Sequence, residues 1–144
     1  MPHATRENLG YLLAKASQRW NELLQRGFAE EGFPEVKASY GSVLIPLFEE
    51  DGLRMGELAR RARLSKQTMT TMVRLCERDG LVERGPDPHD RRAARVHLTG
   101  RARRFQPAAE RVLAGLEREV DAVLGRQGGD ALRRSLGELQ RLPR

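Results

Sequence analysis

The middle of this chain carries two short helical patterns with very little sequence between them. The first covers residues 55–63, and the second begins after Ser65 and continues to about Arg78. Three residues separate Ala62 from Lys66, a connection as short as the turn of a helix-turn-helix. Few arrangements of two helices allow so tight a turn, so this spacing predicts a helix-turn-helix.

The same part of the chain carries most of the positive charge. Residues 54–104 hold fourteen Arg or Lys against six Asp or Glu, a local balance of +8, whereas the rest of the chain holds twelve against fourteen. Positive charge concentrated on one element is an electrostatic footprint for a polyanion. A nucleic acid is therefore the expected partner.

The second helix of the pair is predicted to have two different faces. Met69, Met72, Val73 and Cys76 recur at helical spacing and form an apolar stripe. The opposite stripe carries amide, hydroxyl and cationic groups that suit base edges in a major groove, and the helix N-terminus favours phosphate. An ordinary solvated face is the alternative, but the tight turn favours a recognition helix. Its candidate DNA contacts are Ser65, Lys66, Gln67, Thr68, Thr70, Thr71 and Arg74.

A basic β-hairpin is predicted directly after this helix. Residues 81–84 and 94–98 alternate like strands, and residues 86–90 are rich in turn-forming Pro and Asp. An arginine on a thin hairpin can enter a minor groove, and a carboxylate two residues away can orient its guanidinium. A charged turn without a partner is the alternative. The candidate contacts of this wing are Asp90, Arg91, Arg92 and Arg95.

Long amphipathic helices are predicted on both sides of the basic segment. The first is expected to begin near Thr5, and another to continue from Gly100 to about Leu124, with Gly128-Gly129 separating a last helix. Their leucine stripes need a surface to bury them, and a two-fold partner supplies one. A homodimer is therefore predicted, with a monomer that covers these helices itself as the alternative.

Other classes of site find little support in the sequence. Asp87, His89 and Asp90 could suggest a metal site, but nothing visible completes the ligand shell, so no metal or other cofactor is expected. No nucleophile is matched with a base and no glycine loop cradles phosphate, so the chain is not expected to be an enzyme. Cys76 continues an apolar stripe and is expected to be a buried packing thiol rather than a redox sensor.

The expected compartment is the cytoplasm, with no membrane partner. No apolar stretch approaches the roughly 18–20 residues that cross a bilayer, and the N-terminus lacks the layout of a secretory signal. A single cysteine fits a reducing environment.

The segment from Gly56 to Arg104 resembles the winged helix-turn-helix of the multiple-antibiotic-resistance regulator (MarR) family. The stretch Asp87-Pro88-His89-Asp90-Arg91-Arg92, continuing to Leu98-Thr99, is similar to the wing of that family. The resemblance implies a mainly α fold with a small β-hairpin wing (α+β) in a single domain, residues 1–144. Within it, residues 36–100 would form the DNA-binding lobe, and residues 5–30 and 100–143 the dimerisation helices.

The resemblance also implies a function. It predicts a homodimeric, sequence-specific, double-stranded-DNA-binding bacterial transcription regulator that grips a pseudo-palindromic operator. Such a protein is most often a repressor relieved by a small-molecule effector. Ser65, Lys66, Gln67, Thr68 and Thr71 would face the major groove, and Arg92, held by Asp90, would enter the minor groove.

Three further interpretations remain open at this point. Tyr11, Trp20 and Tyr40 are candidates for the wall of an effector pocket, or else they are core residues. An oxidant-sensing regulator of the same fold would act through Cys76. A winged-helix adaptor would bind another protein and no DNA.

Overall fold

The structure, a computed structural model, describes residues 2–143 of the chain. Its three strands form one antiparallel sheet in the order β1-β3-β2. The predicted mainly α fold with a small wing is confirmed. In chain order the elements are α1 (Leu9–Glu30), the 3₁₀ helix η1 (Ala38–Tyr40), α2 (Gly41–Glu49), β1 (Leu53–Arg54), α3 (Met55–Ala62), α4 (Lys66–Arg78), β2 (Val82–Asp87), β3 (Asp90–Leu98) and α5 (Gly100–Leu139). None of the helices within residues 2–143 combines the length and apolarity needed to cross a membrane.

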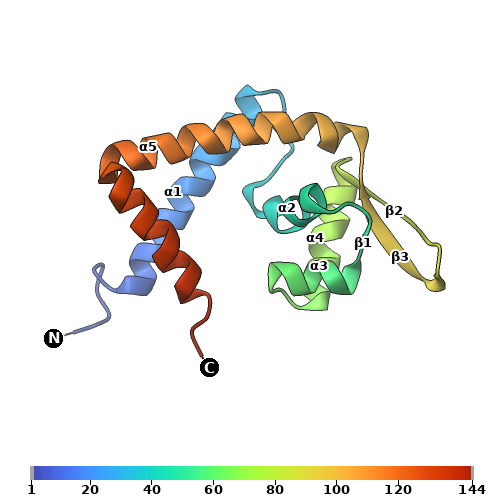
Figure 1. Cartoon of the computed structure of the whole chain (residues 1–144), viewed down its shortest axis with the longest axis horizontal. Helices are drawn as coiled ribbons and strands as arrows, with labels where there is room; N and C mark the ends of the chain where they lie inside the picture. Colours follow the sequence, from blue (N-terminus) through green and yellow to red (C-terminus); the bar gives the residue numbers. More distant parts are fainter. Residues whose placement is uncertain (1, 144) are drawn as a thin grey trace.

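The molecule has two parts, which α5 connects (Figure 1). Residues 41–98, from α2 to β3, form a winged lobe in which α3 and α4 lie beside the sheet. The helix α5 leaves the end of β3 and continues away from this lobe to a sharp bend, after which the chain turns back. Both termini therefore lie at the end of the molecule that is remote from the wing.

The sheet contains a strand that the sequence pattern did not predict. The hairpin pairs β2 with β3, so that Val82 lies opposite Leu98. The added strand β1 pairs with the other edge of β3, with Arg54 opposite Arg95. A strand of two residues is too short to show a period of two, which is why no alternation revealed it.

An aromatic cluster joins the lobe to the long helices. The ring of Phe105 in α5 lies 4.8 Å from that of Phe28 in α1 and 5.2 Å from that of Phe33, both edge to face. The ring of Phe48 in α2 lies 6.5 Å from the same Phe105 ring. Aromatic pairs at such separations are stabilising beyond the area they bury. The cluster therefore fixes how α5 sits on the base of the lobe.

The helix boundaries follow local capping rather than the first polar residue. The prediction that the first helix begins near Thr5 is wrong, because the side chain of Asn8 accepts hydrogen bonds from the N–H groups of Gly10 and Tyr11 and α1 begins at Leu9. Ser65 caps α4 as predicted, since its Oγ accepts a bond of 3.0 Å from Thr68 N–H.

The bend in α5 lies at Gly125, not at Gly128-Gly129 as the sequence suggested. Gly125 has φ 77° and ψ 157°, a conformation open almost only to glycine. Gly129 instead stays helical and packs against the side chain of Asp121. Arg133 closes the bend by pairing with Glu117 at 3.1 Å and with Asp121 at 3.3 Å.

Candidate nucleic-acid interface

The turn between α3 and α4 sets the position of the recognition helix. Arg63 ends α3 in the left-handed conformation, with φ 56°, and its N–H bonds back to Arg60 O. Its neighbour Leu64 donates to Ala59 O, which completes the cap. The chain can therefore start α4 at Lys66, three residues after Arg63, with Ser65 as the cap.

The two faces of α4 differ as the sequence predicted. Met69, Val73 and Cys76 are buried against the lobe. The candidate contacts Ser65, Lys66, Gln67, Thr68, Thr71 and Arg74 are all exposed, and Thr70 is half-buried. The hydroxyl groups of Thr70 and Thr71 donate to Lys66 O and Gln67 O, at 2.8 and 3.2 Å. The exposed face thus offers amide, hydroxyl and cationic groups on a rigid helix.

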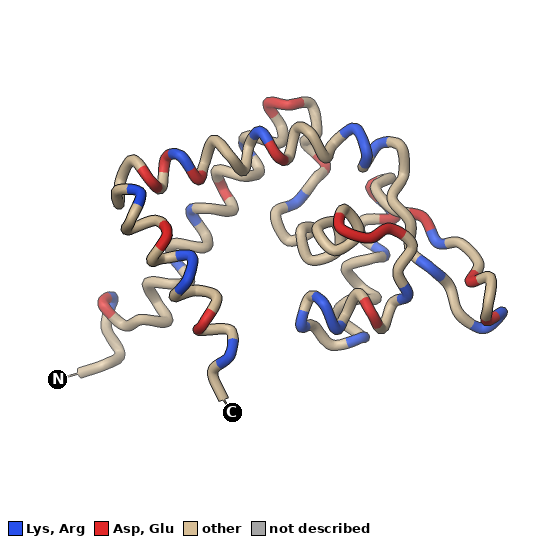
Figure 2. The backbone as a smooth tube through the Cα atoms, in the orientation of Figure 1, with Lys and Arg blue, Asp and Glu red and all other residues tan. Residues whose placement is uncertain are grey.

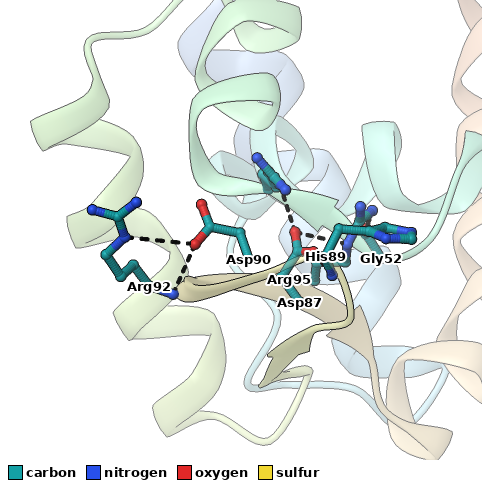
Figure 3. A network of polar contacts seen from close by, with 7 residues as sticks. Gly52, Asp87, His89, Asp90, Arg92 and Arg95 are labelled. Atoms are coloured by element: carbon teal, nitrogen blue, oxygen red, sulfur yellow. Dashed lines mark hydrogen bonds and ion pairs between the residues drawn. The ribbon is translucent and has the colours of Figure 1, made fainter.

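The tip of the hairpin carries a fully exposed arginine beside a carboxylate. Asp90 Oδ1 accepts a bond of 2.9 Å from the backbone N–H of Arg92, and the Nε of Arg92 lies 3.9 Å from the same oxygen (Figure 3). The side chain of Arg92 is 96% exposed. Arg91 is also exposed. The predicted partnership of Asp90 and Arg92 is therefore present in the structure.

Arg95, also predicted to contact DNA, lies in the middle of β3, opposite Gly85 of β2 and Arg54 of β1. Its Nε donates to Asp87 Oδ2 at 3.2 Å and its Nη1 to Gly52 O at 2.9 Å. Asp87 has no exposed side-chain surface and also accepts from Arg54 Nε at 2.5 Å. Two nitrogens of the Arg95 guanidinium are thus bonded within the protein, and its contact with DNA stays a prediction.

The sequence pattern did not reveal the centre of this network, the carboxylate of Asp87 (Figure 3). The Arg54 guanidinium, the His89 backbone N–H and the Arg95 charge lower the pKa of Asp87 to about 2. Asp87 is therefore ionised at neutral pH. Asp87 lies in a stretch of turn-forming residues, which gives no sign of this role. The part that Arg54 plays becomes visible only in the pairing of β1 with β3.

Positive charge gathers along the α3–α4 turn, whereas basic and acidic residues alternate on the hairpin (Figure 2). Part of it is balanced locally: Glu57 bonds to both Arg60 and Arg61. These two arginines lower the pKa of Glu57 to about 2. The basic side chains nearest the helix N-terminus and the wing tip, Lys66 and Arg92, remain exposed.

Cys76 lies on the apolar face of α4 and is completely buried. Burial raises the pKa of its thiol to about 12, and the nearby Asp79 charge acts in the same direction. A thiol in this setting stays protonated and packs as a small apolar group. The position does not favour an oxidant sensor.

The three aromatic candidates for an effector pocket lie in different places. Tyr11 is exposed on α1, and Tyr40 is buried, with its hydroxyl 2.5 Å from Asp79 Oδ2. Tyr11 lines a surface hollow with Ala4, Thr5, Arg6 and Asn8. Trp20 lines a different cavity, which measures about 250 Å³ and lies between α1, α2 and α5. Other lining residues, which the sequence did not single out, include Leu24, Phe28, Val36, Lys37, Ile45, Phe48, Phe105 and Leu113.

Comparisons with known proteins agree with this geometry. A family model described as MarR family matches residues 47–93. The HTH-type transcriptional repressor YetL of Bacillus subtilis (strain 168) is 31% identical over 112 residues, which are 75% of this chain and 62% of the relative. The chain thus spans less than two thirds of the length of this relative.

Two solved structures resemble the whole chain. The transcriptional repressor CouR, bound to a 23-mer DNA duplex, superposes with a TM-score of 0.80 at 26% identity and covers 97% of this chain and 100% of its own. A probable transcriptional regulator from Pseudomonas aeruginosa gives the same TM-score and identity over 92% of this chain and 97% of its own. The similarity therefore extends beyond the winged lobe to the flanking helices.

Proposed function

We propose that the chain is a member of the MarR family, whose model matches residues 47–93, and that it is a homodimeric transcription regulator that binds double-stranded DNA in a sequence-specific manner. In this proposal α4 enters a major groove and the hairpin tip enters the neighbouring minor groove. Acting on DNA, the protein would work in the cytoplasm. It would act as a repressor whose grip on DNA a small effector relieves.

The observation that carries the proposal is the joint exposure of two elements. The polar face of α4, from Lys66 to Arg74, and the guanidinium of Arg92 are both free to meet a partner. Gln67 and Arg74 carry the groups that pair with adenine and guanine edges. Arginine is favoured in a narrow, strongly negative minor groove.

Exposed leucines support the homodimer. Leu9, Leu12 and Leu13 of α1 are 61, 51 and 39% exposed, and Leu132 and Leu136 beyond the bend of α5 are each 40% exposed. These residues lie on the helices remote from the wing, at the end that carries both termini (Figure 1). A second copy would cover them and would place two lobes on one duplex, about one helical turn apart.

The cavity beside Trp20 supports an effector site. Its walls come from α1, α2 and α5, so an occupant would touch both the lobe and the long helices. Lys37 at its lining offers a cation to an anionic group, while Leu24, Phe28 and Phe105 offer apolar contact. A ligand that prefers one angle between lobe and helices would shift the protein toward or away from the geometry that fits DNA.

Selection of bound sequences from random duplex DNA tests this function. We expect a two-fold-symmetric site, and affinity that falls steeply with salt because phosphate contacts release counterions. A winged-helix adaptor would instead enrich no sequence and would bind its partner with little dependence on salt. An unenriched pool at moderate salt would overturn the proposal.

A further inference from the structure

A basic cleft lies between α3, the start of α4 and the hairpin. It measures about 550 Å³, and four of its lining side chains are cationic: Arg54, Lys66, Arg84 and Arg92. They come from β1, α4, β2 and β3, so the fold brings together charges that are far apart in the sequence. The carboxylate of the lining residue Glu57 is already bonded to Arg60 and Arg61.

We infer that this basic cleft holds a phosphodiester group of the DNA strand that separates the two grooves, an inference that rests on the proposed function. In a duplex, one sugar–phosphate strand forms the wall between a major groove and the minor groove beside it. A protein with α4 in the first groove and Arg92 in the second must straddle that strand. The basic cleft lies between these two elements, where the strand would pass.

The chemistry of the cleft suits a phosphate rather than a base. Lys66 is the first residue of α4, where free N–H groups and the helix dipole favour an anion. Arg84 is held loosely, with its Nε 3.6 Å from Glu77 Oε1 and its side chain 38% exposed. A guanidinium binds phosphate oxygens strongly and in a fixed geometry.

Arg54 connects the cleft to the wing. Its Nε is bonded to Asp87, the buried carboxylate that also holds Arg95. The side chain still lines the cleft and is 45% exposed, so its terminal nitrogens can meet a phosphate. A phosphate bound there would contact the same network that positions the hairpin.

The test compares Arg84→Gln with Arg84→Lys and with Arg104→Gln, a charge-matched control on α5 outside the cleft lining. Each protein is titrated against the selected duplex and a scrambled duplex over a range of salt. We expect Arg84→Gln to weaken both duplexes by the same factor, about tenfold or more, and to reduce the salt slope by about 0.9 for each lobe. Arg84→Lys should keep the slope, and Arg104→Gln should behave like the parent.

A second measurement identifies the phosphate. Single phosphates of the selected duplex are replaced by neutral methylphosphonates, and each duplex is titrated with the parent and with Arg84→Gln. We expect one position in each half-site at which the parent loses affinity and the variant loses none further. If Arg84→Gln does not fold, as judged by circular dichroism, Lys66→Gln replaces it in both measurements.

The outcomes separate this inference from the proposed function. A parent protein that binds no duplex overturns DNA binding and the cleft together. A parent that binds, with losses from Arg84→Gln that add to those of every methylphosphonate, overturns the cleft alone. A loss restricted to the selected duplex would assign Arg84 to base contact and would also overturn it.

Discussion

Asp87 Oδ2 accepts a hydrogen bond of 2.5 Å from Arg54 Nε and thereby ties the turn of the hairpin to the residue that precedes α3. The backbone N–H of His89 donates to the other oxygen of the same carboxylate at 2.7 Å. The direction in which the wing projects is thus set by one buried carboxylate, and the tip residue Arg92 is carried on this support.

Replacing Asp87 with Asn should alter the acid stability of the protein. Because the pKa of Asp87 lies at about 2 in the folded chain against 3.8 for a free carboxyl, its ionised form stabilises the fold above about pH 4. That contribution is lost as the pH falls toward 2. Urea unfolding followed by circular dichroism between pH 5 and 2 should therefore show a smaller decrease for the variant than for the parent. Parallel curves would contradict the assigned pairing.

The two arginines of the hairpin should behave differently when each is replaced by Ala. Arg92→Ala removes a fully exposed guanidinium, so we expect severely weakened DNA binding, an intact dimer and an unchanged urea midpoint. Arg95→Ala breaks the bonds to Asp87 and Gly52, so the urea midpoint should also fall. Anisotropy titrations and urea unfolding of both variants make the comparison. Parent-like affinity of Arg92→Ala at physiological salt would contradict the role of the wing.

Cys76 should be inert in the folded protein. Its buried thiol has a pKa raised to about 12, so a thiol reagent at pH 8 should label it only in denaturant. Cys76→Ser should keep DNA binding and its indifference to peroxide, but lose about 1–3 kcal/mol of stability because a hydroxyl is then buried at an apolar site. Rapid labelling of the native protein would revive the oxidant-sensing interpretation.

The bend at Gly125 should be needed for assembly. Gly125→Ala places a Cβ at φ 77°, which costs about 1–3 kcal/mol or forces the last part of α5 into another direction. Since Leu132 and Leu136 lie beyond the bend, we expect the dimer dissociation constant of the variant, measured by analytical ultracentrifugation, to be at least about tenfold higher than that of the parent. Gly137→Ala, in open helical space, is the matched control and should stabilise by about 0.4–1 kcal/mol. Equal dimer affinities of the two variants would exclude this role.

Tyr40 should act as a structural residue of the lobe. Its hydroxyl donates a hydrogen bond to Asp79, just beyond the end of α4. Burial is the larger cause and this bond the second that raise the pKa of Tyr40 to about 12. Tyr40→Phe should therefore lose about 1.5–3 kcal/mol in urea unfolding, the range for a hydrogen bond to a charged group. Tyr11→Phe, on an exposed ring, should lose almost nothing. If the Tyr40→Phe variant is as stable as the parent in urea unfolding, this bond contributes little to the stability of the fold.

The winged lobe could be predicted from sequence because its elements carry strong local patterns. Ser65 is a capping residue ahead of a helical period, and the two hairpin strands flank Pro- and Asp-rich turn chemistry. The exposed face of α4 follows directly from its apolar stripe. The partnership of Asp90 with Arg92 could be expected because their spacing is short.

Features that depend on contacts between distant residues could not be predicted. The role of Arg54 follows from a two-residue strand, which brings its side chain to Asp87, thirty-three residues away in sequence. The hydrogen bond of Arg95 depends on the same buried aspartate. The bend of α5 lies at Gly125, the residue inside this helix that adopts a positive φ, whereas the pair Gly128-Gly129 carried the stronger local signal. Likewise, only the three-dimensional packing shows that Trp20 lines a cavity whereas Tyr40 is a buried core residue.

The most direct test of the account is a comparison of affinities for the selected duplex and for a scrambled duplex of the same composition, at about 0.15 M salt. We expect two chains on each selected duplex and binding at least about 10³-fold tighter than to the scrambled one. Equal affinity for the two duplexes, or a single chain on each, would contradict the proposed function.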